Sequence, residues 1–288
     1  MLEGRRLQKE TEMPKNSIKP QLGCEALVPL KVTVAPNGAR KTKTDHPNLP
    51  VSIEDIAYTA RQCSAAGAHE LHLHIRDGKG QHTLDPARYR EAISAVSEAA
   101  PDMQIQITTE AAGLFDVAEQ FETLKQLVPS AASVSVREMA RDDTVSRQLY
   151  AFAHEAGVSI QHILYDARDI AQYRAWLSDA AIASTQRDVL LVTGQYNPPK
   201  PAKVEELSPL LTALAGEMSS WTVCAFGESE QAVMQSVIRQ GGHVRVGFEN
   251  NVHRSDGQLL KDNAESVSGV VQCANRLGRS MLGKVQGQ

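Results

Sequence analysis

The fold is decided by the stretch Ser159-Ile-Gln-His-Ile-Leu-Tyr165 and by the segments that follow it. A segment of helical period begins at Ile170, and a second short apolar run, Asp188-Val-Leu-Leu-Val-Thr193, comes after it. Two such runs with a helix between them are typical of a β-α-β unit, whose two strands are parallel. The stretch therefore predicts a parallel sheet covered by helices.

The same alternation extends in both directions along the chain. Strands are expected at Leu30–Ala35, Glu70–His74, Gln104–Thr108, Ser133–Val136, Ser159–Tyr165, Asp188–Thr193, Trp221–Cys224 and Val244–Gly247. Helices are expected to begin at Ile53, Pro86, Val117, Thr144, Ile170, Val204, Gln231 and Ala264. About eight units close a barrel, so the sequence predicts a (β/α)8 TIM barrel. An open doubly wound sheet is the rival fold, but no Gly-x-Gly-x-x-Gly follows the first strand.

Chain length predicts one catalytic domain. The chain has 288 residues, and a single barrel takes roughly 250. Residues 1–27 are mostly polar and lack periodicity, so we expect a flexible N-terminal extension followed by the barrel over residues 28–288.

Composition excludes several classes of protein. A formal net charge of −4 gives no electrostatic case for nucleic-acid binding, and no run is long and apolar enough to span a membrane. Residues Met1 to Pro20 lack the apolar central stretch that a secretory signal would show. Four widely spaced cysteines, Cys24, Cys63, Cys224 and Cys273, favour reduced thiols. We therefore expect a cytoplasmic enzyme, assembled as a homo-oligomer, either a dimer or a tetramer.

The second predicted strand carries two histidines on one face. It reads Glu70-Leu-His-Leu-His-Ile-Arg76, and because strand side chains alternate, His72, His74 and Arg76 should point the same way. Barrel active sites lie at the carboxyl ends of the strands, so the two imidazoles would face that site. They form two thirds of a zinc site, or else a pair of hydrogen-bonded core histidines.

A carboxylate follows the last predicted strand. The chain there reads His243-Val-Arg-Val-Gly-Phe-Glu-Asn-Asn251, which places Glu249 just past the strand end. Glu249 could complete a His₂Glu set that leaves a coordination position open for water or substrate, as catalytic zinc sites do. The alternative is a solvated loop carboxylate. Other divalent metals also accept this ligand set.

Several motifs resemble the β-keto acid cleavage enzymes, whose type is 3-keto-5-aminohexanoate cleavage enzyme. The similarity runs from about Val28 to Gly278. It is carried by Thr33–Pro36 with Asn37-Gly38, Asp45-His-Pro-Asn-Leu-Pro50, His72-Leu-His-Ile-Arg76, Gln106-Ile-Thr108, Gly241-Gly-His-Val-Arg245 and Gly247-Phe-Glu-Asn-Asn251.

The resemblance implies a zinc-dependent barrel enzyme with defined roles for its residues. By resemblance His72, His74 and Glu249 are the metal ligands, Arg245 is an active-site arginine, and Thr108 and Ser133 are hydroxyl residues at the substrate. The implied reaction takes a β-keto acid and acetyl-CoA to acetoacetate and a shortened acyl-CoA. A barrel lyase or hydrolase acting on a related keto acid without CoA is the alternative enzyme, and a binding protein without turnover is the other.

Two positions depart from the type enzyme. Asn250 replaces an aspartate that acts as the base, and an amide cannot accept a proton at neutral pH. Glu110 is the candidate replacement, or else it forms a structural ion pair. Arg40 replaces the acid that receives a substrate ammonium group. Arg40 would then favour dicarboxylic β-keto acids, unless it pairs with Glu110 and leaves the pocket neutral for uncharged chains.

Overall fold

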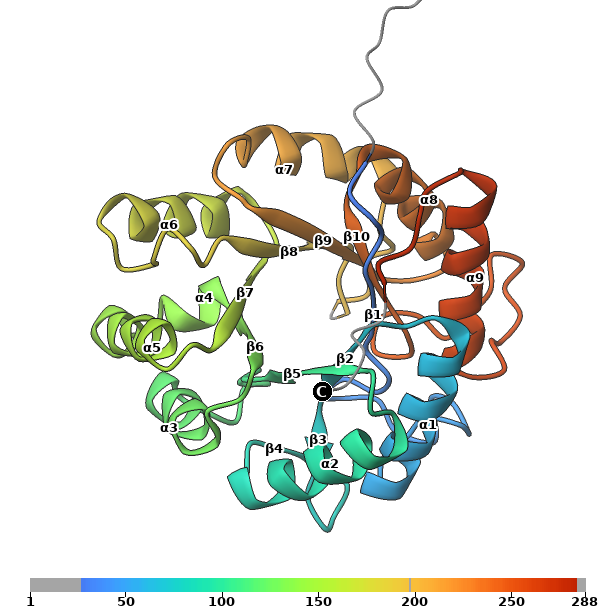
Figure 1. Cartoon of the computed structure of the whole chain (residues 1–288), viewed down its shortest axis with the longest axis horizontal. Coiled ribbons are helices and arrows are strands. Elements are labelled where there is room, and N and C mark those ends of the chain that lie inside the picture. The colour runs from blue at the N-terminus through green and yellow to red at the C-terminus, as the bar shows by residue number, and fades with distance from the viewer. Residues whose placement is uncertain (1–26, 197, 284–288) are drawn as a thin grey trace, which may run out of the picture.

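A closed barrel of eight parallel strands forms the centre of the molecule, and helices form a ring around it (Figure 1). The computed structural model describes residues 27–196 and 198–283. The predicted (β/α)8 barrel is therefore confirmed. The N-terminal extension predicted for residues 1–27 lies outside the described residues, apart from Leu27.

The barrel strands all lie close to their predicted positions. They are β1 (Val32–Val34), β2 (Glu70–Leu73), β5 (Gln104–Thr108), β6 (Ala131–Ser135), β7 (Ser159–Leu164), β8 (Asp188–Thr193), β9 (Ser220–Ala225) and β10 (His243–Val246). Their order around the barrel is β1-β10-β9-β8-β7-β6-β5-β2. Thr33 closes the ring, because it is in register with Arg245 of β10 on one side and Glu70 of β2 on the other.

The covering helices follow the strands in turn. They are α1 (Ile53–Ala66), α2 (Pro86–Ala99), α3 (Val117–Leu127), α5 (Asp143–Glu155), α6 (Ala167–Ser178), α7 (Leu207–Ala213), α8 (Glu230–Gln240) and α9 (Asn263–Arg276). Local chemistry sets several of their starts. Ser52 accepts a hydrogen bond from the Asp55 amide, and Asp85 accepts one from the Ala87 amide beside a first-turn proline.

Short elements near the barrel mouth differ from the predicted pattern. The strand expected through His74 ends at Leu73, and Ile75–Arg76 (β3) pairs instead with His82–Thr83 (β4) in an antiparallel hairpin. Asp77 stabilises the turn between them by accepting hydrogen bonds from the Lys79 and Gln81 amides. A short helix, α4 (Val136–Met139), follows β6 directly, and a 3₁₀ turn, η1 (Val204–Glu206), leads into α7 where the sequence predicted a helix start at Val204.

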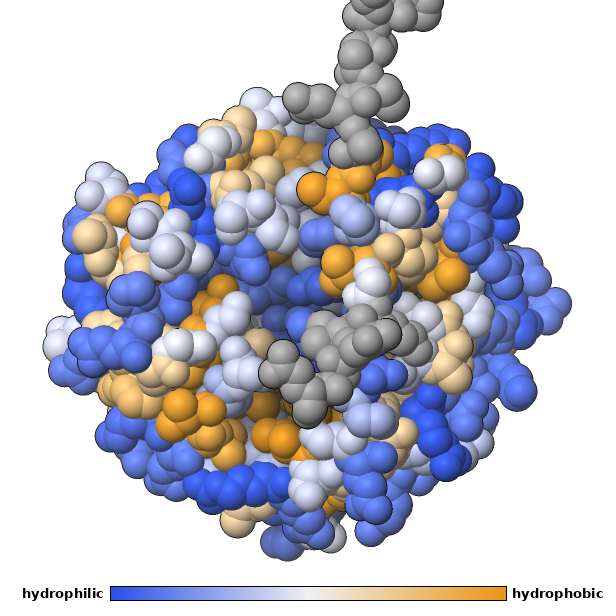
Figure 2. Space-filling model, viewed as in Figure 1, coloured by the Kyte–Doolittle hydropathy of each residue, from blue (hydrophilic) through white to orange (hydrophobic). Residues whose placement is uncertain are grey.

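The main hydrophobic core lies between the strands and the helices. It includes Val34, Leu71, Ile107 and Val134 from the strands, each fully buried. Figure 2 shows hydrophilic side chains around the rim of one face, with hydrophobic side chains in small scattered areas between them. Among the described residues, no helix is long and apolar enough to cross a membrane. The described cysteines, Cys63, Cys224 and Cys273, are buried free thiols.

Candidate active site

A cavity of about 840 Å³ opens where the strands end. Seven of the nine site residues predicted from the sequence line its wall: Arg40, His72, Thr108, Glu110, Ser133, Arg245 and Glu249. His74 does not line the wall but lies next to His72, and Asn250 is buried outside the wall. The cavity therefore brings together side chains from β2, β5, β6 and β10 and from the loop after β1, as the barrel prediction requires.

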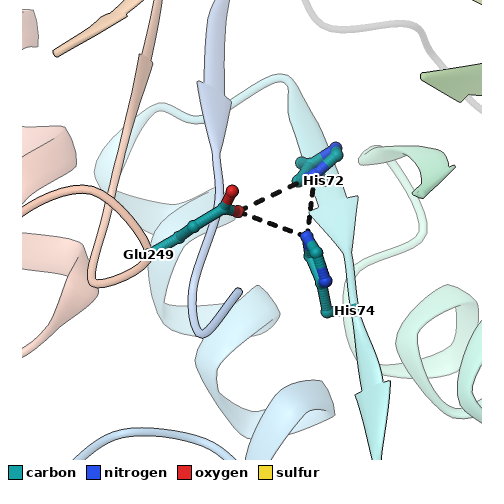
Figure 3. A group of neighbouring side chains, drawn as sticks. All are labelled: His72, His74 and Glu249. Carbon is teal, nitrogen blue, oxygen red and sulfur yellow. Dashed lines mark hydrogen bonds and ion pairs between the residues drawn. The ribbon is translucent and has the colours of Figure 1, made fainter. Parts of the chain in front are cut away.

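Two imidazoles and one carboxylate converge at one side of this cavity (Figure 3). The Nε2 atoms of His72 and His74 lie 3.1 Å apart. Oε2 of Glu249 lies 3.7 Å from Nε2 of His72 and 3.5 Å from Nε2 of His74. The potential ligand atoms of all three residues lie within 4.8 Å of one another.

The three side chains fit a divalent metal ion. Two imidazole nitrogens face each other, and the buried Glu249 Oε2 has no hydrogen-bond donor among the described residues. A cation between them would satisfy all three lone pairs at once. Two histidines and one carboxylate are also a ligand set of catalytic zinc sites, in which a fourth position stays open.

The barrel interior fixes the orientation of His72. Its Nδ1 atom lies 2.8 Å from Oε1 of Gln106, so Nδ1–H donates there and Nε2 keeps its lone pair for a metal. Gln106 in turn donates to Gln161, and Gln161 donates to Thr222. Burial and the nearby Arg245 charge lower the pKa of His72 to about 3, which keeps the ring neutral at pH 7.

The loop after β1 and Arg245 of β10 hold Glu249 in place. Its amide donates to the Ala35 carbonyl, and Nζ of Lys41 donates to the carbonyls of Phe248 (2.6 Å) and Glu249 (3.2 Å). Arg245 Nη2 donates to Glu249 Oε1 at 3.2 Å. Burial alone would raise the pKa of Glu249, but the charge of the adjacent Arg245 holds that pKa well below its ordinary value.

Arg245 brings unused hydrogen-bond donors into the site. Its side chain is buried, and its Nη2 atom is shared between Glu249 and the sulfur of Cys224. Nε and Nη1 have no acceptor among the described residues. A buried guanidinium with two free donors is suited to a negatively charged oxygen.

Hydroxyl groups line the wall between β5 and β6. Thr108 accepts a hydrogen bond from the Glu110 amide at 3.0 Å. Ser133 and Ser135 are buried at the cavity, and neither Oγ atom has a partner among the described residues. The sequence interpretation missed Ser135. The alternation of strand side chains could have found it, because residues 133 and 135 lie on the same face of β6.

Glu110 lies between a cation and the metal-ligand cluster. Its Oε1 accepts a hydrogen bond from Arg40, and its Oε2 lies 3.9 Å from Nε2 of His74. The ion pair between Arg40 and Glu110, which the sequence left as one of two alternatives, is therefore present. Asn250, by contrast, has a buried side-chain amide with no partner among the described residues. It does not line the cavity.

Arg76 has a different position from the one its sequence pattern predicted. The strand ends before it, and its guanidinium donates to the carbonyls of Gly38, Ala39 and Lys41. It thus holds the loop that carries Arg40 and Lys41 to the cavity.

The barrel and the polar cavity at its carboxyl end define an enzyme of the (β/α)8 class. Residues 29–286 match the family model of the beta-keto acid cleavage enzymes. The chain belongs to this family.

Individual relatives agree with this assignment. A 3-keto-5-aminohexanoate cleavage enzyme of Fusobacterium nucleatum is 30% identical over 88% of this chain and 93% of its own length. A 3-oxoadipate:acetyl-CoA acetyltransferase of Cupriavidus necator is 24% identical over 87% of this chain and 90% of its own. The fold is also similar to that of ObcA in its binary complex with oxaloacetate. That comparison has a TM-score of 0.69 and 15% identity, and covers 82% of this chain and 65% of ObcA.

Proposed function

We propose that the enzyme uses a divalent metal, zinc, to convert a β-keto acid and acetyl-CoA into acetoacetate and a shortened acyl-CoA. The observation that carries the proposal is the convergence of His72, His74 and Glu249 at the wall of the cavity. The acetyl-CoA acetyltransferase among the relatives supports the second substrate.

The metal, when bound, supplies Lewis-acid polarisation of the keto oxygen. The chain's own residues prepare the site for it. Gln106 fixes the ring of His72, and Arg245 and Lys41 hold the side chain and backbone of Glu249. Such outer contacts orient metal ligands and typically affect metal affinity by about 10- to 100-fold.

Arg245 and the hydroxyl residues bind the negative charges of the substrate. Loss of a proton from the carbon between ketone and carboxylate leaves an enolate, whose charge the free donors of Arg245 would stabilise. Thr108 and Ser133 line the facing wall and would bind the substrate carboxylate. Both sets of contacts also orient the enolate carbon for attack on the thioester.

Glu110 takes the proton in this proposal. Its Oε2 faces the histidine cluster, while Arg40 holds its other oxygen. The enolate carbon then forms a bond to the acetyl carbon and releases the CoA thiolate. That thiolate attacks the original ketone, the old carbon–carbon bond breaks, and the proton returns from Glu110 to the acetoacetate carbon. The atoms balance without any further reactant.

An isotope experiment tests this proposal. Metal-loaded protein is incubated with a β-keto acid and acetyl-CoA that carries ¹³C in its acetyl group, and the products are analysed by mass spectrometry. The label should appear in acetoacetate, and the new acyl-CoA should carry none. Cleavage of the keto acid at the same rate without acetyl-CoA would instead identify a lyase or a hydrolase.

A further inference from the structure

The wall of the cavity has a polar part and an apolar part. Strands β2, β5, β6 and β10 contribute the polar groups described above, whereas the adjacent strands β7, β8 and β9 contribute Ile163, Val192 and, just past the end of β9, Phe226. Tyr165, just past the end of β7, extends this apolar part toward the opening.

The apolar part is a hydrophobic cluster separate from the main core. It consists of Ile163, Leu190, Val192, Cys224, Tyr165 and Phe226. Ile163 shares one face of β7 with Gln161, which hydrogen-bonds to Gln106 inside the barrel, so the cluster faces the barrel interior. An apolar wall on a ligand cavity provides a favourable surface for the hydrocarbon part of a ligand.

The cations that line the cavity already have acceptors within the protein. Arg40 binds Glu110, Lys200 binds Glu206 at 2.6 Å, and Arg245 binds Glu249. Arg137 donates to Asp166 and Asp169, and Lys41 donates to two backbone carbonyls. Each lysine and arginine among the described lining residues therefore has an acceptor within the protein.

We propose that the distal group of the β-keto acid is an uncharged hydrocarbon chain that packs against Ile163, Val192 and Phe226. This inference rests on the proposed function, because the polar part of the wall must hold the keto acid group. A distal carboxylate or ammonium packed against this wall would lie unpaired among apolar side chains, or would have to displace a partner that a lining charge already has. Both outcomes are unfavourable. The arginine at position 40 does not change this, because Glu110 already accepts its hydrogen bond.

Three β-keto acids of equal length test the inference. One ends in an alkyl group, one in a carboxylate and one in an ammonium group. The alkyl compound should have the highest kcat/KM, and each added methylene should raise kcat/KM up to about fourfold while the wall can still cover it. Equilibrium binding of the same compounds to metal-loaded protein, without acetyl-CoA, should follow the same order.

A pair of variants on β8 locates the effect. Val192→Thr keeps the side-chain volume but places a hydroxyl on the wall, so it should reduce the preference for the alkyl compound severalfold. Val189→Thr makes the same change on the opposite face of the strand, in the main core, and should lower stability without altering the preference.

The possible results separate the inference from the function on which it rests. A preference for either charged compound would overturn the inference, and so would a Val192→Thr variant whose only defect is a higher KM for acetyl-CoA. If no compound yields acetoacetate, the proposed function fails. The binding order then still decides whether the wall selects an apolar chain.

Discussion

The loop after β1 rests directly on Glu249. A Cβ atom added to Gly38 would lie 2.6 Å from Cγ of Glu249, which is closer than real Cβ atoms come to other atoms. Gly38 also has a φ of +63°, a conformation that favours glycine. The Gly38→Ala variant should therefore displace the predicted metal ligand and lower metal affinity by about 10- to 100-fold, the usual effect of disturbing a ligand's support.

Metal titration with a competing chelator measures this change. Gly157→Ala is the matched control, because Gly157 has a similar φ of +72° but no atom within 4 Å of an added Cβ. The control carries the same backbone strain without the collision. Equal metal affinity in Gly38→Ala and Gly157→Ala would contradict the role given to this contact.

His74→Ala should remove most of the bound metal. The variant deletes one of the three converging side chains and leaves an incomplete ligand set. Elemental analysis after dialysis gives the metal content per chain, and circular dichroism checks the fold. His154→Ala, which removes an exposed histidine from α5, should retain the wild-type content. Full occupancy in His74→Ala would refute the ligand assignment.

The fold was predictable because each long strand and helix carries its own periodic signal. The eight barrel strands and their following helices begin within a few residues of the predicted positions. The β3–β4 hairpin was missed, since its two-residue strands are too short to show any period. The same hairpin explains why Arg76 does not continue the face of His72 and His74.

The candidate site was predictable where neighbouring positions of the chain carry two of its residues. His72 and His74 are neighbours on alternate positions, so the sequence alone predicts that they meet. The partner of Arg40 could not be settled in this way. Glu110 lies 70 positions away, and only the closed arrangement of the strands brings the loops after β1 and β5 together.

Glu110→Gln should lower turnover by about two to four orders of magnitude, the usual effect of losing a general base. Metal content should stay near the wild-type value, because Glu110 is not one of the three clustered ligands. Single-turnover kinetics, together with exchange of the substrate's C2 proton into deuterated water, measures the step directly. Near-normal exchange in the variant would rule out Glu110 as the proton acceptor.

Two further variants control for this interpretation. Glu206→Gln also removes a lining carboxylate that is paired with a cation, but at the rim beside Lys200, so it should not slow proton exchange comparably. Asn250→Asp, added to Glu110→Gln, places an acid at position 250, where the resemblance implies an aspartate. It should recover little exchange, because Asn250 does not line the cavity.

Glu230 is a buried acid that contacts the loop carrying Glu249. It is 5% exposed, and its Oε2 accepts a hydrogen bond from Asn251 at 3.1 Å. Its Oε1 has no partner among the described residues. Burial raises the pKa of Glu230 from 4.5 to about 8, although the Asn251 hydrogen bond and the Lys41 charge oppose this shift. The carboxyl group is therefore mostly protonated in the folded protein at neutral pH.

This raised pKa makes stability depend on pH in a defined direction. Between pH 4.5 and about 8, the folded protein keeps a proton on Glu230 that the unfolded chain has lost. The stability that comes from keeping this proton is therefore complete below pH 4.5 and is lost as pH rises through about 8. Glu230→Gln keeps an acceptor for Asn251 and does not ionise. Its free energy of unfolding, relative to wild type, should thus rise by a few kcal/mol between pH 5 and pH 8.5. Urea denaturation at the two pH values measures the difference, with the exposed Glu228→Gln as control. A difference that stays constant with pH would show that Glu230 ionises normally in the folded protein.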